Sequence, residues 1–185
     1  QLVGDGTRRL STLKSGDVLN AVLPLGNSFS LPEKNEKVLL IGGGVGTAPM
    51  LFLGSYLRNA GFVPHFLLGA RSSRDILQKE QFEALGIVDV TTEDGSYGEK
   101  GYVTQHSLLQ KEHFDRIYTC GPKPMMVAVA RYAKGKGIKC EVSLENMMAC
   151  GVGACLCCVE NTTEGHICVC KEGPVFNIEK LLWQI

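Results

Sequence analysis

The stretch that decides the fold spans residues 37–49 and reads KVLLIGGGVGTAP. The apolar run Val38–Ile41 is short, carries no alternation and ends in glycines. Such a run fits a β-strand that is buried on both faces. We expect a helix over 47–60 to follow it, ending at Gly61. Residues 37–61 therefore predict a buried strand, a glycine turn and a helix.

The same alternation continues as far as residue 144. We expect strands at 64–69, 88–92, 116–119 and 139–144, helices at 75–85 and 122–134, and a short helix after Val103. Alternating strands and helices are typical of a parallel sheet covered by helices on both faces. The fold class is therefore α/β, with residues 33–144 as a nucleotide-binding domain.

The glycine turn carries the first functional signal. Gly44-x-Gly46 resembles the dinucleotide-binding fingerprint, although Pro49 stands where its third glycine would be. Gly44 and Gly46 allow close approach of the backbone to a pyrophosphate, and Thr47 begins the helix whose N-terminus would face it. Taken alone, the motif also fits an ordinary glycine-rich turn.

A second motif follows the strand expected at 116–119. Cys120, Gly121 and Pro122 come directly after this strand, and Pro122 suits the first turn of the next helix. Ligands bind at the carboxyl ends of parallel strands, so both motifs should face one crevice. We expect Cys120 to contact a nicotinamide ring there, with packing as the alternative.

Composition excludes several classes of function. The chain has 185 residues, with 19 Lys and Arg against 19 Asp and Glu, which gives no electrostatic case for binding nucleic acid or an anionic membrane. No apolar run approaches the ~18–20 residues that span a bilayer. The first residues, from Gln1, do not resemble a signal peptide, so we expect a cytoplasmic protein and a fragment of a longer chain.

The first 32 residues differ from the rest. They hold too few apolar residues for a core of their own. We expect short strands and turns here, with a strand at Val18–Leu23. Residues 1–32 are therefore interpreted as the end of a larger β-domain, followed by a polar linker.

The region 145–185 forms a third part and is organised around cysteine. Six of the chain's 8 cysteines lie here. Four of them, Cys150, Cys155, Cys158 and Cys170, follow the spacing C-x4-C-x2-C with a distant fourth cysteine, which is typical of plant-type [2Fe–2S] ligation. Gly151 lies between the first two of these cysteines and lets the backbone approach a cluster closely.

Two other readings of these cysteines remain open at this point. A four-cysteine zinc site usually takes its ligands in two similar short pairs, which fits less well. Disulfides require an oxidising compartment, and nothing marks export. Cys157 and Cys168 do not preserve the spacing and are interpreted as small buried residues, and Cys140 as a core residue.

Together these motifs resemble the ferredoxin reductase-like flavoproteins, and among them the electron transfer subunits of B-type dihydroorotate dehydrogenase. The resemblance covers essentially the whole chain. It rests on Gly42–Pro49, Cys120–Pro122, Ala149–Cys158 and the tail Val169–Phe176. Related transhydrogenase-type reductases usually carry Asp as the first cluster ligand, so Cys150 argues against that relative.

The resemblance implies a role in pyrimidine biosynthesis. Electrons would come from an FMN-containing subunit that oxidises dihydroorotate, in a hetero-oligomer expected to be a heterotetramer, and would pass through a [2Fe–2S] cluster and FAD to NAD⁺. Cys150, Cys155, Cys158 and Cys170 would ligate the cluster. Nucleotide binding would involve Gly44, Gly46, Thr47, Cys120, Gly121 and Pro122.

The flavin-binding part departs from the family pattern. Gly4–Thr7 resembles the Gly-Thr turn near the flavin pyrophosphate, so Gly6 and Thr7 would contact FAD. Pro24–Asn27 resembles the segment that closes the family's flavin barrel. We find no counterpart of the Arg-Pro-x-Ser segment that holds the flavin ring. FAD binding is therefore implied for the parent protein.

Two rival functions are kept. One is a stand-alone or differently partnered NAD(P)H:acceptor oxidoreductase, because Arg71 follows the second strand, where an arginine can meet a 2′-phosphate. The family favours NAD, and Arg71 also fits a solvated loop or a pair with Asp75. The other rival is a binding module whose cysteines hold zinc.

Overall fold

The fold is built on one mostly parallel sheet, described by a computed structural model for residues 2–183. Its seven strands run in the order β4-β3-β2-β1-β5-β6-β9. All neighbouring pairs are parallel except β6 with β9. The bounds of these strands are β1 Val38–Gly43, β2 His65–Ala70, β3 Ile87–Thr92, β4 Glu99–Lys100, β5 Arg116–Cys120, β6 Lys139–Ser143 and β9 Val175–Asn177.

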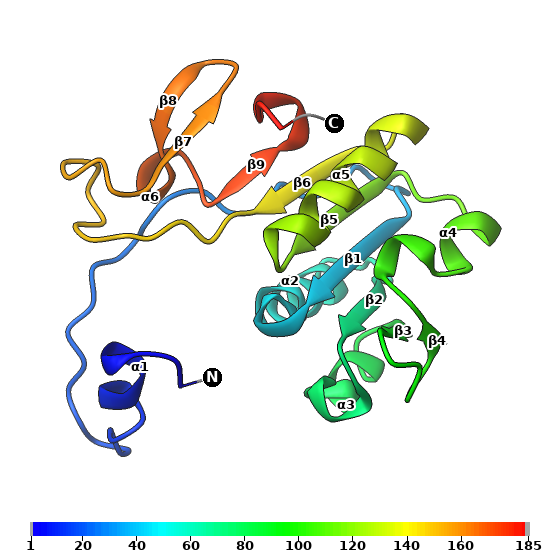
Figure 1. The fold of residues 1–185 in the computed structure, drawn as a ribbon, viewed down its shortest axis with the longest axis horizontal. Coiled ribbons are helices and arrows are strands. Elements are labelled where there is room, and N and C mark those ends of the chain that lie inside the picture. The colour runs from blue at the N-terminus through cyan, green and yellow to red at the C-terminus, as the bar shows by residue number, and fades with distance from the viewer. Residues whose placement is uncertain (1, 184–185) are drawn as a thin grey trace.

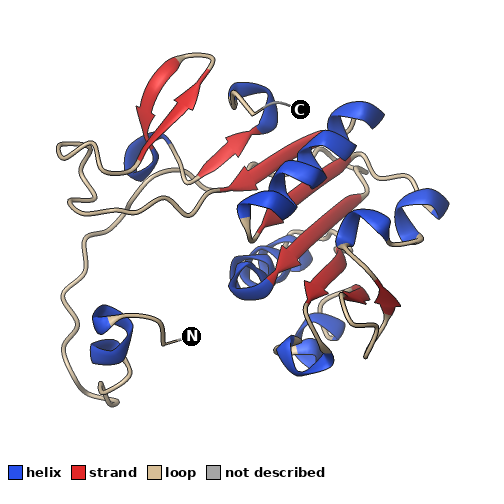
Figure 2. Ribbon diagram, viewed as in Figure 1, coloured by secondary structure: helices blue, strands red, loops and turns tan. Residues whose placement is uncertain are grey.

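Helices cover both faces of this sheet (Figure 2). The α-helices are α1 Asp5–Leu10, α2 Thr47–Asn59, α3 Lys79–Glu83, α4 Leu108–Lys111, α5 Lys123–Lys136 and α6 Val169–Glu172. Single 3₁₀ turns lie at Gly44–Gly46, Ser73–Asp75, Val103–Gln105 and Ile178–Lys180. A separate hairpin pairs β7 Val159–Thr162 with β8 Gly165–Cys168. The predicted α/β class is confirmed.

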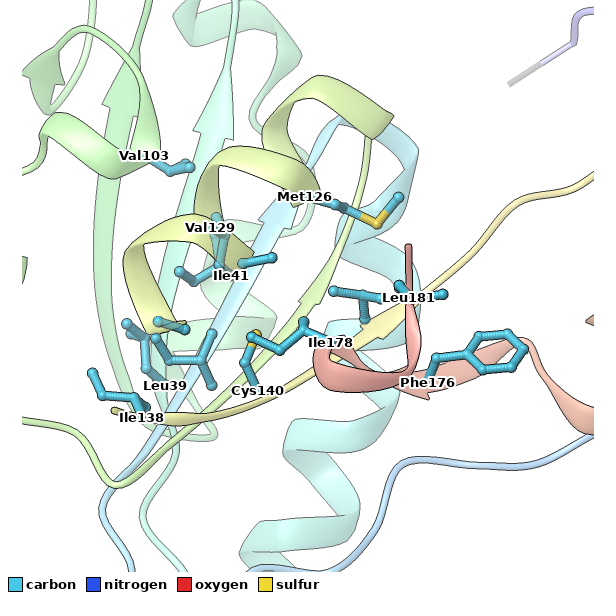
Figure 3. Packing of buried hydrophobic residues seen from close by; sticks show 14 of the residues in the cluster. Leu39, Ile41, Val103, Met126, Val129, Ile138, Cys140, Phe176, Ile178 and Leu181 are labelled. Carbon is cyan, nitrogen blue, oxygen red and sulfur yellow. The ribbon is translucent and has the colours of Figure 1, made fainter. Parts of the chain in front are cut away.

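Alternate residues of β1 divide the core into two layers. Val38 and Leu40 face a cluster that includes Met50 and Leu57 of α2. Leu39 and Ile41 face the other cluster, which contains the buried side of α5 (Figure 3). All six residues of β1 are buried, as expected of a central parallel strand.

The cysteine region shares the second of these layers. Cys158 and Cys170 are buried in the same cluster as Val129 of α5. Phe176 and Ile178 lie on the same side of the sheet and extend that cluster toward the chain's end (Figure 3). The cysteine region is therefore packed onto the nucleotide-binding sheet through a common hydrophobic core.

Two sequence predictions about secondary structure were wrong. Val18–Leu23 is not a strand; Val18 is 86% exposed and Leu23 81% exposed, and no described segment pairs with them. Instead α1 forms upstream, where the Thr7 hydroxyl accepts the backbone N–H of Gly4 at 3.1 Å. The α1 helix buries no residue and lies apart from the sheet (Figure 1).

The helix expected at 75–85 is also shorter than predicted. Asp75 ends a 3₁₀ turn, in which its carboxylate accepts the hydroxyl of Ser72 at 2.9 Å. Ile76 is extended and Gln78 adopts a left-handed φ of 57°, so α3 begins only at Lys79. The remaining expected strands and helices are found within two residues of their predicted ends, except for the short helix after Val103, which is a 3₁₀ turn followed by α4.

A polar network anchors the linker to the amino end of the sheet. Arg116 donates to Glu36 at 2.8 Å and to the hydroxyl of Ser30 at 2.9 Å. Ser30 donates to Glu141 at 2.6 Å, and the Tyr118 hydroxyl donates to the Ser30 carbonyl at 2.8 Å. Residues 30–36 are thereby fixed across β5 and β6.

Candidate functional site

The two nucleotide motifs lie against each other at the carboxyl edge of the sheet. In the β1–β5 ladder Gly42 is opposite Cys120, so the loops that follow begin side by side. A Cβ atom on Gly46 would collide with the backbone of Cys120 and Gly121. Gly46 is required here for close contact between two loops, because its own φ of −66° is open to any residue.

Two helices begin at this edge. Thr47 starts α2, and its hydroxyl donates to the Gly44 carbonyl at 2.9 Å. Pro122 is the N-cap of α5, one residue after the predicted Cys120-Gly121 pair. Helix N-termini present unpaired N–H groups and a partial positive charge, which suits a pyrophosphate. Gly44 is exposed beside these N-termini and has a left-handed φ of 55°.

Cys120 is a neutral buried thiol. It is 2% exposed. Burial, and then the charge of Glu145, raise the pKa of Cys120 to about 11, so the thiolate is absent at neutral pH. A nucleophilic role is therefore not supported, and the side chain is packed in the core cluster that contains Val38 and Leu40.

Sequence reasoning missed one residue beside Cys120. Ser143 ends β6, opposite Cys120 in the β5–β6 ladder, and its hydroxyl is hydrogen-bonded to the thiol. Its place follows once the strand order is known, because a parallel strand adjacent to β5 ends beside it. Ser143 and Cys120 therefore lie side by side at the carboxyl ends of their strands.

The cysteine region places its predicted ligands in two pairs. Cys150 and Cys155 contact each other through their side chains, and so do Cys158 and Cys170. Within residues 2–183, no three His, Cys, Asp or Glu side chains gather around one point suited to a single metal ion. A [2Fe–2S] cluster needs two ligands at each of its two irons, which is the arrangement that two pairs provide.

Backbone N–H groups point at two of the predicted ligand sulfurs. Cys150 Sγ accepts the N–H groups of Cys155 and Val152, each at 3.4 Å, and Cys158 Sγ accepts the N–H of Cys170 at 3.4 Å. The bonds from Cys155 and Val152 lower the pKa of Cys150 to about 6. The bond from Cys170 lowers the pKa of Cys158. Hydrogen bonds of this kind favour the thiolate, the form that binds metal.

The loop between the ligands depends on glycine. Gly151 and Gly153 have φ of 72° and 78°, in the left-handed region. A Cβ on Gly153 would also meet the side chain of Lys171 at 2.6 Å. These glycines let residues 150–155 curl so that successive N–H groups turn inward. The donor set and the loop conformation fit a [2Fe–2S] cluster.

The remaining module cysteines, Cys157 and Cys168, are less buried than predicted, whereas Cys140 is buried as predicted. Cys140 is 1% exposed in β6, so its assignment to the core is confirmed. Cys157 was predicted as buried but is exposed, whereas its neighbour Cys158 is buried. Cys168 is half-buried and its thiol donates to the Gly153 carbonyl at 3.7 Å.

A groove of about 530 Å³ lies beside Cys170. Its walls are mainly apolar and come from three segments, which supply Leu25, the stretch Leu144–Met148, and Val169 with Cys170 and Pro174. The Leu25 side is fixed by Asn27, whose side-chain amide donates to the Glu172 carbonyl at 2.9 Å. Volumes of this size are typical of cofactor sites.

The residues predicted to contact flavin lie away from both sites. Gly6 and Thr7 belong to α1, which makes no buried contact. The structure therefore brings together the nucleotide loops, and separately the four cysteines, but it does not place Gly6 or Thr7 beside either set (Figure 1).

Comparison with known proteins agrees with this arrangement. Residues 145–182 match the model of the iron–sulfur cluster binding domain of dihydroorotate dehydrogenase B, and residues 40–131 match an oxidoreductase NAD-binding domain. The electron transfer subunit of dihydroorotate dehydrogenase B (NAD(+)) from Caldanaerobacter subterraneus subsp. tengcongensis is 41% identical over 187 residues, covering 99% of this chain and 74% of the relative.

The chain belongs to the family of dihydroorotate dehydrogenase B electron transfer subunits. A probable member from Methanocaldococcus jannaschii is 39% identical over 97% of this chain and 69% of its own length. The resemblance inferred from the sequence is therefore confirmed. Because the matched C-terminal model describes an iron–sulfur module, the zinc alternative is set aside.

Solved structures extend the family likeness to the fold. An NADH-dependent reduced ferredoxin-NADP oxidoreductase, studied for flavin-based electron bifurcation, superimposes with a TM-score of 0.86 and 36% identity, over 99% of this chain and 67% of that one. The cytochrome b5 reductase domain of Ulva prolifera nitrate reductase shares only the fold, with a TM-score of 0.56 at 19% identity over 73% of this chain and 61% of that one. Among residues 2–183, no helix is long and apolar enough to cross a membrane.

Proposed function

We propose that this protein is an electron transfer subunit that accepts electrons from an FMN-containing, dihydroorotate-oxidising partner and delivers them to NAD⁺. The observation that carries the proposal is the shared core. Cys158 and Cys170 are buried in one cluster with Val129 of α5, the helix that begins at the nucleotide crevice. The cysteine module and the nucleotide loops therefore belong to one packed unit, as a relay needs.

Each group of residues has a definable task. Cys150, Cys155, Cys158 and Cys170 would hold a [2Fe–2S] cluster, and the N–H groups that point at Cys150 Sγ and Cys158 Sγ would stabilise its negative charge. When bound, the cluster carries single electrons and a flavin converts between one- and two-electron transfer.

The nucleotide crevice supplies binding and orientation. Gly44, Gly46 and Thr47 would cradle the pyrophosphate of NAD at the start of α2. Gly121 and Pro122 would form the opposite wall, with Cys120 as a neutral thiol against the nicotinamide. The chain's own contribution to the reaction is thus to orient the ring and to exclude water.

The flavin would occupy the side of the molecule that faces residues 2–27. The exposed apolar residues of this segment, among them Val18, Leu19 and Leu23, are suited to contact with further protein. The groove between Leu25 and Met148 lies beside Cys170 and is open to an electron carrier. FAD is supported by the 36% identical structure, reported for flavin-based electron bifurcation.

The partner is proposed to be the catalytic subunit, assembled with this chain as a heterotetramer. The relatives' description as an electron transfer subunit implies such a partner. We place the complex in the cytoplasm, because all eight cysteines are free and the four ligands must stay reduced.

The test uses the intact protein together with its catalytic partner. The complex should reduce NAD⁺ when dihydroorotate is added, while this chain alone should not. The purified chain should show broad absorption between ~400 and ~600 nm that dithionite bleaches. Dihydroorotate-dependent NAD⁺ reduction by the chain alone, or colourless protein that holds zinc, would refute the proposal.

A second candidate is an NADPH-linked reductase with another acceptor. It is favoured by Arg71, which is exposed in the loop after β2, where a 2′-phosphate would lie. The two functions differ in nucleotide preference. A Kd for NADPH below that for NADH, with the difference lost in Arg71→Ala, would favour the second candidate.

A further inference from the structure

Cys168 is the one cysteine of the module that neither the ligand spacing nor solvent exposure accounts for. It ends β8, opposite Val159 in the hairpin, which places it beside Cys158. Its backbone continues into Val169, whose N–H donates to the Cys158 carbonyl at 3.1 Å. Cys168 is therefore rigidly placed next to one ligand pair.

The thiol of Cys168 reaches across to the other ligand pair. Its S–H donates to the carbonyl of Gly153, with a distance of 3.7 Å between Sγ and O. Gly153 lies midway in the loop from Cys150 to Cys155. The same thiol is within hydrogen-bonding reach of the Cys158 sulfur. One side chain thus touches both halves of the ligand set.

The loop that Cys168 holds is the one that directs N–H groups at Cys150. Val152 and Cys155 both donate to Cys150 Sγ at 3.4 Å. These bonds require Gly153 to keep its φ of 78°. The loop is therefore held from one side by the stem of Lys171, which fills the place of the missing Cβ, and from the other by the thiol of Cys168.

We propose that Cys168 is a positioning residue that fastens the Cys150–Cys155 loop to the Cys158–Cys170 half of the cluster site. The inference rests on the proposed function, because it concerns the same cluster. Cys168 acts through Gly153 and is not itself a ligand.

Loss of this contact has two measurable consequences. Hydrogen bonds to cluster sulfurs stabilise the reduced cluster, which carries one more negative charge. A more mobile loop directs its N–H groups less well at Cys150 Sγ, so this stabilisation is weakened. The midpoint potential therefore shifts to more negative values. An S–H donor is weak, so release of iron should accelerate by only about twofold to fivefold, which is the effect of one modest hydrogen bond.

The experiment compares three variants of the full chain, each carrying its cluster. Cys168→Ala removes the donor, and Cys168→Ser keeps a shorter one. Cys157→Ala is the matched control, because it removes a neighbouring cysteine whose side chain is exposed. The measurements are iron content, midpoint potential from a dye-mediated titration, the electron paramagnetic resonance spectrum of the reduced cluster, and the rate of iron release to a chelator.

We expect Cys168→Ala to retain two irons per chain, with a more negative potential and iron release about twofold to fivefold faster. Cys168→Ser should lie between this variant and the wild type, and Cys157→Ala should match the wild type. A Cys168→Ala protein with wild-type potential and release rate would overturn the inference. So would outright loss of iron from a folded Cys168→Ala protein, because Cys168 would then be a ligand.

The design separates this inference from the proposed function. If the wild-type chain takes up no iron after reconstitution, the proposed function fails and the inference fails with it. If wild type and Cys168→Ala both hold the cluster and behave alike, only the role of Cys168 fails.

Discussion

The contact between the two nucleotide loops leads to a sharp prediction for Gly46→Ala. The new methyl group would overlap the backbone of Cys120 and Gly121, and neither can retreat, because Cys120 is held in the β1–β5–β6 ladder. The φ of Gly46 is −66°, so alanine is not strained by its own backbone. The whole cost comes from the overlap between the loops.

Overpacking of this kind costs about 1–3 kcal/mol. For a chain of this size, each kcal/mol lowers Tm by about 2–4 °C, so we expect a fall of about 2–12 °C. Nucleotide affinity should fall as well, because the two loops can separate only by moving apart at the predicted nucleotide site. We expect the Kd for NADH to rise about tenfold, which corresponds to a loss of about 1.4 kcal/mol of binding free energy.

The assay is a pair of measurements, thermal unfolding and NADH titration by calorimetry. Gly135→Ala is the matched control, because this glycine lies inside α5 and a Cβ there would meet nothing within 4 Å. The control should raise stability by about 0.5–1 kcal/mol and leave the Kd unchanged. A Gly46→Ala protein with wild-type NADH affinity and wild-type Tm would refute the assignment of this contact to the nucleotide site.

Three further predictions concern other parts of the chain. Cys155→Ser should abolish stable cluster absorption while circular dichroism of the sheet is retained, because one of the four proposed ligands is lost. Burial opposes the charged form of Glu36, but hydrogen bonds from Arg116 and Lys139 outweigh it and lower the pKa of Glu36 to about 2. Because this pKa lies below the ordinary 4.5, the stabilisation is complete above about pH 4.5 and is lost as the pH falls toward 2. Glu36→Gln should therefore lower the free energy of unfolding by about 1–3 kcal/mol at pH 7, measured by urea titration. The variant should also lose less stability than the wild type when the pH is lowered from 4.5 toward 2. Gly26→Ala should release the segment before it from the cysteine module, because a Cβ there would collide with the Gly173 carbonyl and the φ of Gly26 is 63°. Limited proteolysis of residues 18–26 should therefore become faster.

Each of these three variants has a control in the same region. Cys157→Ser should keep the cluster, and equal loss from both cysteine variants would contradict the ligand assignment. Glu33→Gln removes an exposed partner of Lys139 and should change stability little; an equal cost would mean that charge alone, without burial, matters. Gly16 also has a positive φ, of 97°, but a Cβ there would meet nothing, so Gly16→Ala should not accelerate cleavage at residues 18–26.

The sheet was predictable from sequence because its signals are local and strong. Val38–Ile41 is buried on both faces, and the glycines after it end the strand where the sequence places them. The cysteine spacing was equally readable, since a cluster fixes the distances between its ligands. The prediction failed for Val18–Leu23, because a strand needs a partner for its backbone groups and the described residues offer none.

Other features depend on contacts that are distant in sequence. The pairing of Ser143 with Cys120 follows only when the strand order is known. The hydrogen bond from Cys168 to Gly153 depends on how the β7–β8 hairpin folds back over the ligand loop. The ion pair between Glu36 and Arg116 joins residues 80 positions apart. No periodicity in a single sequence encodes such pairings.

Strand β9 connects the cysteine module to the edge of the main sheet, which is a structural role separate from electron transfer. It pairs antiparallel with β6 through Val175–Asn177 and is the last strand on that side of the sheet. A chain cut after residue 144 would leave the N–H and C=O groups of β6 open to the strands of other molecules, which is a known route to aggregation. A nucleotide-binding half that is produced without this module would therefore need another strand beside β6, such as one carrying charged residues or proline, to remain monomeric.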